Sequence, residues 1–150
     1  INGDHSIEKC DEVTRNTLRC LFDELKSIDI YFPGVILKPS MVISGDTNTH
    51  RADYETVADM TVNCLKELCP KDLGGIAFLS GGQTNDEATT HLKLMNSGKY
   101  ELPWRVTFSY ARAIQQSALN AWSGKDENHG EAQSILSERA KLCSDASIGS

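Results

Sequence analysis

The sequence has 150 residues, of which 39% are hydrophobic and 24% are charged, and these values are typical of one soluble globular domain. Its formal net charge of -6 argues against nucleic acid and against an anionic membrane as partners, although a local pocket could still bind a small anion. No run approaches the roughly 20 apolar residues that a membrane span needs. We therefore expect a single domain over residues 1–150.

Five cysteines, an odd number, occur without the pattern of a secretory signal. Cys64 and Cys69 are not at the spacing of a zinc knuckle, and no second pair follows them. Cys10, Cys20 and Cys64 fall at apolar positions of helical segments, where a free thiol packs as a small hydrophobe. We therefore expect free thiols and a protein of the reducing cytoplasm.

The first elements alternate between two hydrophobic periodicities. Apolar residues at three-to-four spacing predict a helix from about Ile7 to Leu25, with Asp4 or Ser6 as its N-cap. The later run Val35-Ile36-Leu37 is apolar at every position. Such a run is typical of a strand that is covered on both faces, as in a parallel sheet.

The rest of the chain continues this alternation of helices and strands. Thr84-Asn85-Asp86-Glu87 has the pattern of a capping box, which opens a helix toward Met95. The other predicted elements are a helix with an apolar stripe from Val57 to Leu68, strands at Gly74–Leu79 and Trp104–Phe108, a helix that begins at Tyr110-Ala111-Arg112, and a last helix over about Glu127–Leu142.

The predicted order is helix, strand, helix, strand, helix, strand, helix, helix. Strands that are joined by helical crossovers run parallel, with right-handed connections. The sequence therefore predicts an α/β fold built from parallel βα units, either as an open doubly wound sheet or as part of a barrel. In both arrangements ligands bind at the C-terminal ends of the strands.

Lys38 stands at the end of the first strand, after three aliphatic residues and before a proline. Burial of this amine would disfavour its charged form and lower its pKa from about 10.4. A neutral amine is what Schiff-base formation with a carbonyl compound requires. The alternative is a lysine that extends from the strand end into solvent.

The other two strand ends carry features that suit an anion. Ser80-Gly81-Gly82 lies between a strand and a capped helix, where backbone amides can converge on an anion, although a simple tight turn would have the same pattern. Arg112 lies in the first turn of a helix, where a cation opposes the helix dipole unless an anion is bound. Ser109 could add a hydroxyl donor, and the alternative for Arg112 is a solvated surface position.

The four histidines do not have metal-ligand spacing, and we expect solvated or capping roles for them. They are His5, His50, His91 and His129.

Three segments resemble motifs of the class I fructose-bisphosphate aldolases, in the same order and at the same intervals. The resemblance continues beyond these motifs and runs nearly end to end. The matching segments are Leu37-Lys38-Pro39-Ser40-Met41-Val42, Phe78-Leu79-Ser80-Gly81-Gly82-Gln83 and Phe108-Ser109-Tyr110-Ala111-Arg112-Ala113, followed by Gln115 to Trp122 and preceded by Gly3-Asp4-His5 with Cys10.

The resemblance implies a (β/α)8 barrel, of which these residues are the last three strands with their helices. It also implies an enzyme of glycolysis and gluconeogenesis that reversibly cleaves fructose 1,6-bisphosphate to dihydroxyacetone phosphate and glyceraldehyde 3-phosphate. In this family a lysine that matches Lys38 attacks the C2 carbonyl, and the imine serves as the electron sink, so no metal ion or other cofactor is needed. Family members are usually cytoplasmic homotetramers.

The resemblance assigns a substrate phosphate to the second and third motifs. The matching positions are Ser80, Gly81, Gly82, Ser109, Ala111 and Arg112. Ala111 stands where some members have glycine, and its expected role is to offer a backbone amide.

The chain also departs from the family pattern. The sequence contains neither the family's acid–base glutamates of the fifth strand nor its C-terminal tail. We therefore expect no aldolase turnover from these 150 residues alone, unless a complementing barrel half supplies the other groups. The alternative function is a catalytically incomplete fragment that acts as a binding or scaffold module.

Overall fold

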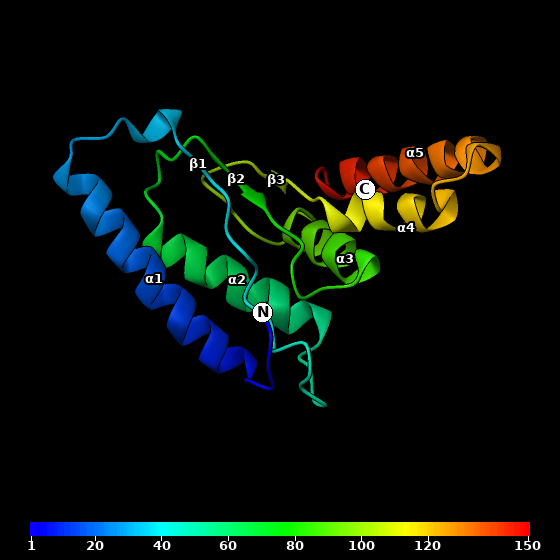
Figure 1. Cartoon of the computed structure of the whole chain (residues 1–150). Coiled ribbons are helices and arrows are strands. Elements are labelled where there is room, and N and C mark those ends of the chain that lie inside the picture. Colours follow the sequence, from blue (N-terminus) through cyan, green and yellow to red (C-terminus); the bar gives the residue numbers. More distant parts are fainter.

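The computed structural model describes all 150 residues (Figure 1). Its helices and strands alternate along the chain in the predicted order. They are α1 (Ile7–Ser27), the 3-10 turn η1 (Phe32–Gly34), β1 (Ile36–Leu37), α2 (Tyr54–Leu68), β2 (Gly75–Phe78), α3 (Asn85–Met95), β3 (Val106–Phe108), α4 (Arg112–Trp122), the 3-10 turn η2 (Asp126–Asn128) and α5 (His129–Ala146).

The three strands form one parallel sheet in the order β1-β2-β3. Ile36 pairs with Gly75, and Ile76 pairs with Val106. Helices α2 and α3 are the crossovers between consecutive strands, and this geometry requires parallel pairing. The predicted α/β fold with a parallel sheet is therefore confirmed.

The two faces of the sheet differ in burial. Ile76, Phe78 and Val106 lie on the face that the helices cover, and all three are buried. Successive side chains of a strand point to opposite faces, so Ile36 and Thr107 lie on the other face, and both are exposed. The prediction that the first strand is covered on both faces is wrong for this chain, because Ile36, on the second face of β1, is exposed.

Side chains at the predicted caps begin two of the helices, α1 and α3. Ser6, not Asp4, caps α1 by accepting a hydrogen bond from the Lys9 amide at 3.4 Å. The capping box of α3 is present, since the Thr84 and Glu87 side chains each accept from the other residue's amide. Such caps satisfy amides that the first turn of a helix leaves without a partner.

Helices α4 and α5 form an antiparallel pair that extends beyond the sheet (Figure 1). The chain reverses at Ser123 and Gly124, which have φ values of +50° and +72°. The predicted last helix is correct in kind, but it runs on to Ala146. Cys143 and Ala146 are buried in the core, and this packing extends the helix beyond the predicted end at Leu142.

The five cysteines are free thiols, as predicted. Burial raises the pKa of the Cys64 thiol to about 11 and that of Cys69 to about 12. The packing prediction is wrong for Cys20, which is exposed on α1. None of the helices combines the length and the apolar character that crossing a membrane requires.

Candidate active site

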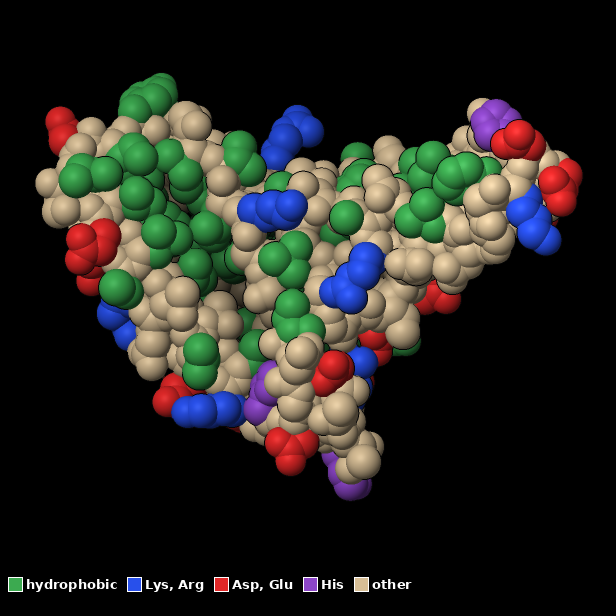
Figure 2. All heavy atoms as spheres, viewed as in Figure 1, with side chains coloured by type: hydrophobic (Ala, Val, Ile, Leu, Met, Phe, Trp, Pro, Cys, Tyr) green, Lys and Arg blue, Asp and Glu red, His purple; other side chains and the backbone are tan.

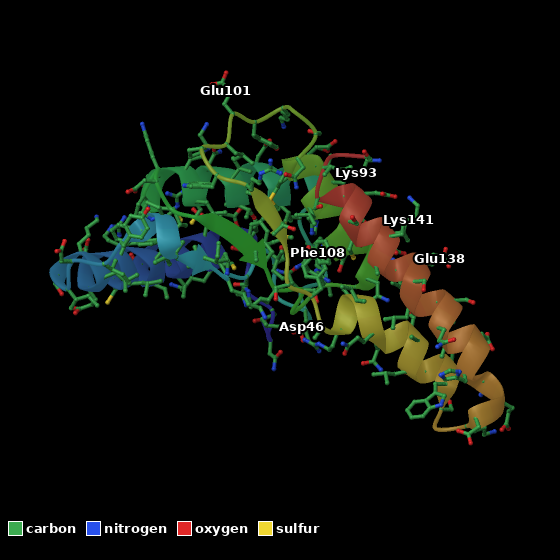
Figure 3. The ribbon with its side chains drawn as sticks, turned by 90° about the horizontal axis from the view of Figure 1, so that it is seen from above. Asp46, Lys93, Glu101, Phe108, Glu138 and Lys141 are labelled. Carbon is green, nitrogen blue, oxygen red and sulfur yellow. The ribbon has the colours of Figure 1, made fainter.

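The three strand ends that the sequence singles out lie side by side. The Leu79 amide donates to the Pro39 carbonyl at 3.0 Å, and the Ser109 amide donates to the Phe78 carbonyl at 2.8 Å. These bonds continue the parallel pairing beyond the regular strands and place Lys38 on the strand next to the Ser80 turn. Phe108, at the end of β3, marks this end of the sheet in Figure 3.

Lys38 lines a groove of about 580 Å³ between the end of β1 and helix α1. Hydrophobic side chains gather around this hollow in Figure 2, and α1 contributes both hydrophobic side chains and Lys9 to the lining. Of the two alternatives that the sequence left open for Lys38, the structure has the lysine that extends into solvent, since its side chain is exposed. The reason is the position of β1 at the edge of the sheet, where no neighbouring strand covers the residue.

Ser80 to Gln83 form a tight turn after β2. The Gln83 amide donates to the Ser80 carbonyl at 3.3 Å, and Gly82 has a φ of +74°. A positive φ at the third position of such a turn favours glycine. The amides of Gly81 and Gly82 donate no hydrogen bond within the chain, so both can serve an anion.

The turn is also closely packed against the first residue of the chain. A Cβ atom on Gly81 would lie 2.5 Å from Cδ1 of Ile1, and one on Gly82 would lie 2.9 Å from Cδ1 of Ile43. Gly82 is therefore required by its backbone conformation, whereas the side-chain ends that crowd a Cβ at Gly81 could shift to admit one.

The third strand end leads directly into helix α4. Arg112 is exposed in the first turn of the helix, as predicted. Ala111 is the N-cap and offers no side-chain acceptor, so the first amides of α4 are not capped by a side chain. Ser109 and Ala111 are exposed beside Arg112, whereas Tyr110 is buried and donates its hydroxyl to the Ala88 carbonyl at 2.9 Å. The buried Tyr110 anchors the segment against α3.

Sequence reasoning missed an arginine that contacts the Ser80 turn. Arg51 precedes α2 and donates from Nη2 to the Gly82 carbonyl at 2.9 Å. Its Nη1 lies 3.2 Å from Oε1 of Glu87, in the capping box of α3. Nothing in the local pattern around Arg51 indicates this contact, because it joins two loops that are distant in sequence.

His91 is buried, so its predicted solvated or capping role is wrong. It follows Ala88 by three residues and precedes Met95 by four, which places it on the apolar stripe of α3 and could have predicted its burial. Nδ1 of His91 lies 2.7 Å from Oε1 of Gln83, and the ring packs edge-on to Tyr54. Burial lowers the pKa of His91 to about 4.

Arg139 of α5 was also missed, and it joins the starts of α3 and α4. Its Nε donates to the Ala113 carbonyl at 3.0 Å, and its Nη2 donates to the Asn85 carbonyl at 2.9 Å. Nη2 also contacts the Thr89 hydroxyl, and Nη1 pairs with Asp86. Both helices begin just after a segment that is predicted to bind an anion, so this buried guanidinium links the two segments through the helices that follow them.

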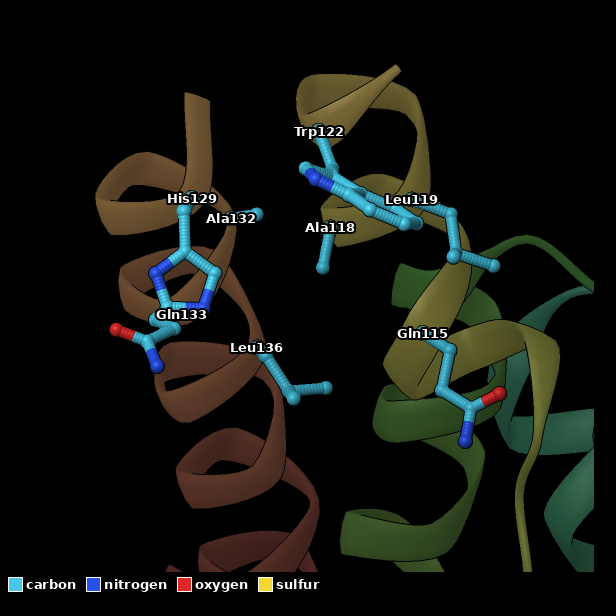
Figure 4. A pocket seen from close by; sticks show the side chains of 8 residues that line it. All are labelled: Gln115, Ala118, Leu119, Trp122, His129, Ala132, Gln133 and Leu136. Carbon is cyan, nitrogen blue, oxygen red and sulfur yellow. The ribbon is translucent and has the colours of Figure 1, made fainter. Parts of the chain in front are cut away.

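A second pocket, of about 290 Å³, lies wholly between α4 and α5 (Figure 4). Its lining side chains come from both helices, with Ala118 and Leu136 pointing into the space between them, and none belongs to the three strand ends. They are Gln115, Ala118, Leu119, Trp122, His129, Ala132, Gln133 and Leu136.

The strand ends thus place a primary amine on the strand beside the two segments that the sequence predicts to bind an anion. A carbonyl compound that carries a phosphate group could use both features at once. No three His, Cys, Asp or Glu side chains come together in an arrangement that could hold a metal ion.

Residues 1–150 match the model of the family described as Fructose-bisphosphate aldolase class-I. The chain belongs to this family. The class I aldolase relatives include the probable fructose-bisphosphate aldolase class 1 of Xanthomonas campestris pv. campestris, with 50% identity over 99% of this chain and 45% of that protein. Fructose-bisphosphate aldolase 4, cytosolic, of Arabidopsis thaliana is 41% identical over 99% of this chain and 38% of that protein.

A solved aldolase structure has the same fold. The fructose-bisphosphate aldolase of Plasmodium falciparum, crystallised in complex with TRAP and a small-molecule inhibitor, is 41% identical and superimposes with a TM-score of 0.92. The match covers 99% of this chain and 42% of that chain. The present chain therefore spans less than half the length of the aldolases that it matches.

Proposed function

We propose that this chain supplies the imine-forming lysine and the phosphate-binding segments of a class I fructose-bisphosphate aldolase. The observation that carries the proposal is the direct backbone bonding of the three strand ends, which sets Lys38 on the strand beside the Ser80 turn and that turn beside Ser109. Family membership over the whole chain supports it. The substrate would be a phosphorylated ketose, with fructose 1,6-bisphosphate as the family's own.

In the proposed reaction the Lys38 amine attacks C2 of the ketose, and loss of water gives a protonated imine. The C3–C4 bond then breaks, its electron pair moves into the imine to give an enamine, and the C4 hydroxyl gives up its proton. The Gly81 and Gly82 amides with Ser109, Ala111 and Arg112 would hold the phosphate near the amine.

None of the three strand ends presents a carboxylate that could exchange these protons. The segments 38–40, 80–82 and 109–112 contain no aspartate and no glutamate. We therefore propose that the acid–base group comes from another part of a complete barrel, and that the 150 residues alone form the imine without completing turnover.

The sheet is best explained as the last three strands of a (β/α)8 barrel, with residues 1–150 as one partial domain. The helices cover one face only, and Ile36 on the other face is 60% exposed. In a barrel this face would be the filled interior, and both edge strands would have neighbours. The groove between α1 and β1 would then be covered by another strand or its loop.

The expectations about cellular location, oligomeric state and partners rest on the resemblance to the relatives. We propose a cytoplasmic protein, in line with the relative that is named as cytosolic. A homo-oligomer and a complementing barrel half stay predictions, as does the expectation that neither nucleic acid nor a membrane is a partner.

Borohydride trapping tests the nucleophile. The chain is incubated with dihydroxyacetone phosphate, reduced with sodium borohydride, and measured by intact mass and peptide mapping. We expect a stable adduct on Lys38 that Lys38→Met abolishes. Lys9→Met is the matched control, because Lys9 lines the same groove, and it should keep the adduct.

An adduct that persists in Lys38→Met, or one that depends equally on Lys9, would show that the assignment is wrong. A coupled assay for triose release from fructose 1,6-bisphosphate then measures turnover. Release by the 150-residue chain alone would contradict the proposed need for outside acid–base groups.

A second candidate function is a binding module without catalysis. The open groove beside α1 favours it, since exposed apolar side chains such as Val13 and Leu21 line its wall. The Plasmodium falciparum aldolase was crystallised in complex with TRAP. Absence of any Lys38 adduct would favour this function over the catalytic one.

A further inference from the structure

Arg51 connects the loop after β1 to the turn after β2. Nη2 of Arg51 donates to the Gly82 carbonyl at 2.9 Å, and Nη1 lies 3.2 Å from Glu87. Glu87 itself is held in place, because its carboxylate accepts from the Thr84 amide at 2.7 Å. Both charged side chains are mostly covered, with 29% of Arg51 and 20% of Glu87 exposed. The guanidinium is therefore a fixed group and not a mobile surface charge.

The contact fixes one peptide plane at both of its ends. The carbonyl of Gly82 accepts from Arg51, and the amide of the same peptide unit, on Gln83, donates to the Ser80 carbonyl at 3.3 Å. Because a peptide unit is planar and trans, its two polar groups point in opposite directions, and holding both fixes the plane.

Fixing this plane matters because glycine gives the turn little stiffness of its own. Gly82 has a φ of +74°, in a region that glycine occupies without penalty but also leaves easily. The preceding peptide carries the free Gly82 amide, and its direction follows from the fixed plane and this φ. The free Gly81 amide lies one peptide earlier in the same turn.

We propose that Arg51 is a positioning residue for the phosphate subsite. By holding the Gly82 carbonyl away from the site, it directs the amides of Gly81 and Gly82 toward the phosphate. The inference rests on the proposed function, since that function assigns the turn to a substrate phosphate. Arg51 itself would not touch the substrate.

A positioning role in the phosphate subsite has a signature that a general structural role lacks. It affects a substrate that carries the phosphate and spares the same carbonyl compound without it. We therefore compare the rates at which Lys38 is trapped by borohydride with dihydroxyacetone phosphate and with dihydroxyacetone, both below saturation.

For Arg51→Met we expect about a tenfold slower trapping with dihydroxyacetone phosphate, the loss that corresponds to about one charge-assisted hydrogen bond. Trapping with dihydroxyacetone should stay unchanged. Arg51→Lys keeps the charge but not the planar fork that reaches Gly82 and Glu87 together, so most of the loss should remain. If Arg51→Lys is trapped with dihydroxyacetone phosphate at the wild-type rate, the positive charge alone is sufficient, and the proposal is overturned.

Arg15→Met is the matched control. Arg15 has a similar exposure of 22% and pairs with Asp11 and Glu67, but it joins α1 to α2 away from the turn. It should leave both trapping rates unchanged. Equal slowing of both carbonyl compounds in Arg51→Met would show a general structural role and overturn the proposal.

Binding of inorganic phosphate, measured by calorimetry, separates this inference from the proposed function. We expect the Kd for phosphate to rise about tenfold in Arg51→Met and to stay unchanged in Arg15→Met. An unchanged Kd in folded Arg51→Met overturns the positioning role, whatever the trapping shows. If phosphate binding weakens in Arg51→Met but the wild-type chain forms no Lys38 adduct, the result would instead contradict the proposed chemistry and leave the positioning role supported.

Discussion

His91 shows how burial changes the behaviour of one titratable group. The carboxamide oxygen of Gln83 can only accept, so Nδ1 of His91 is the protonated nitrogen, and Nε2 is buried without a partner. Protonation would place an unpartnered charge in the core. This desolvation lowers the pKa of His91 from 6.5 to about 4, and the nearby Glu87 opposes the shift only in part.

This shift predicts that the protein loses stability in mild acid. Between pH 6.5 and pH 4 the unfolded chain binds a proton that the folded chain does not, so stability is present above this range and is lost as the pH falls. From pH 7 to pH 5 the unfolding free energy of the wild type should fall by about 2 kcal/mol more than that of His91→Gln. Urea unfolding at the two pH values measures this difference.

His129→Gln is the control for this prediction, because His129 is exposed at the start of α5 and should leave the pH dependence as it is in the wild type. Equal slopes for the wild type and His91→Gln would show that His91 is charged in the folded state, and the prediction would be wrong.

At the residue scale the sequence identified which side chains could react or bind an anion, but it did not identify their burial or their long-range contacts. Lys38 and Arg112 were singled out by residue type at a strand end and at a helix start. The sequence left open whether Lys38 is buried or exposed, because this depends on which strand occupies the edge of the sheet. The contact between Arg51 and Gly82 was not predictable either, since it joins loops from two different βα units.

At the scale of elements, helix α5 holds the starts of α3 and α4 together and in this way acts as a brace for the strand ends. Through Arg139 it hydrogen-bonds carbonyls in the first turns of α3 and α4. Helix α3 begins just after the Ser80 turn, and α4 begins just after Ser109, so both helices follow a segment that we propose binds phosphate. A buried arginine with fixed acceptors therefore holds the relative position of the two helix starts.

Removal of this brace should destabilise the fold. Arg139→Met removes the charged donor that bonds the Ala113 and Asn85 carbonyls and the Thr89 hydroxyl from a third helix, and we expect a loss of about 3 kcal/mol in unfolding free energy. Lys141→Met is the control on the same helix, since Lys141 is 74% exposed and its ion pair with Asp145 should contribute less than about 1 kcal/mol. Chemical denaturation of both variants gives the comparison, and similar losses would refute the bracing role.

The sequence predicted the kind and order of the elements because their signals are local. The apolar stripe of α2, the capping box of Thr84 and Glu87, and the glycines before α3 lie within a few residues of the structures they specify. The end of α5 at Ala146 was missed because distant packing decides it.

At the scale of the whole molecule, the sheet has helices on one face and an uncovered other face. Ile36 lies on this uncovered face at an edge strand, which presents both an apolar side chain and unpaired backbone groups. Edges of this kind pair readily with other chains. The isolated 150-residue chain should therefore self-associate through the uncovered face.

Ile36→Thr tests this expectation, because threonine keeps the β-branched shape and removes apolar surface. We expect weaker self-association in sedimentation velocity at rising protein concentration, with the unfolding free energy changed by no more than about 0.5 kcal/mol. Ile148→Thr, at a residue 70% exposed after α5, should leave the association unchanged. Association that responds equally to both variants would place the contact elsewhere.

The sequence by itself determined the α/β class, the parallel order of the βα units, the three strand ends and the family. Each of these features is indicated by local periodicity, by turn residues or by motifs at fixed intervals. Only the tertiary structure decided that Lys38 is exposed, that His91 is buried, and that Arg51 contacts the Ser80 turn while Arg139 joins the starts of α3 and α4. Burial and long-range contacts depend on which elements become neighbours in space, and no local pattern specifies that.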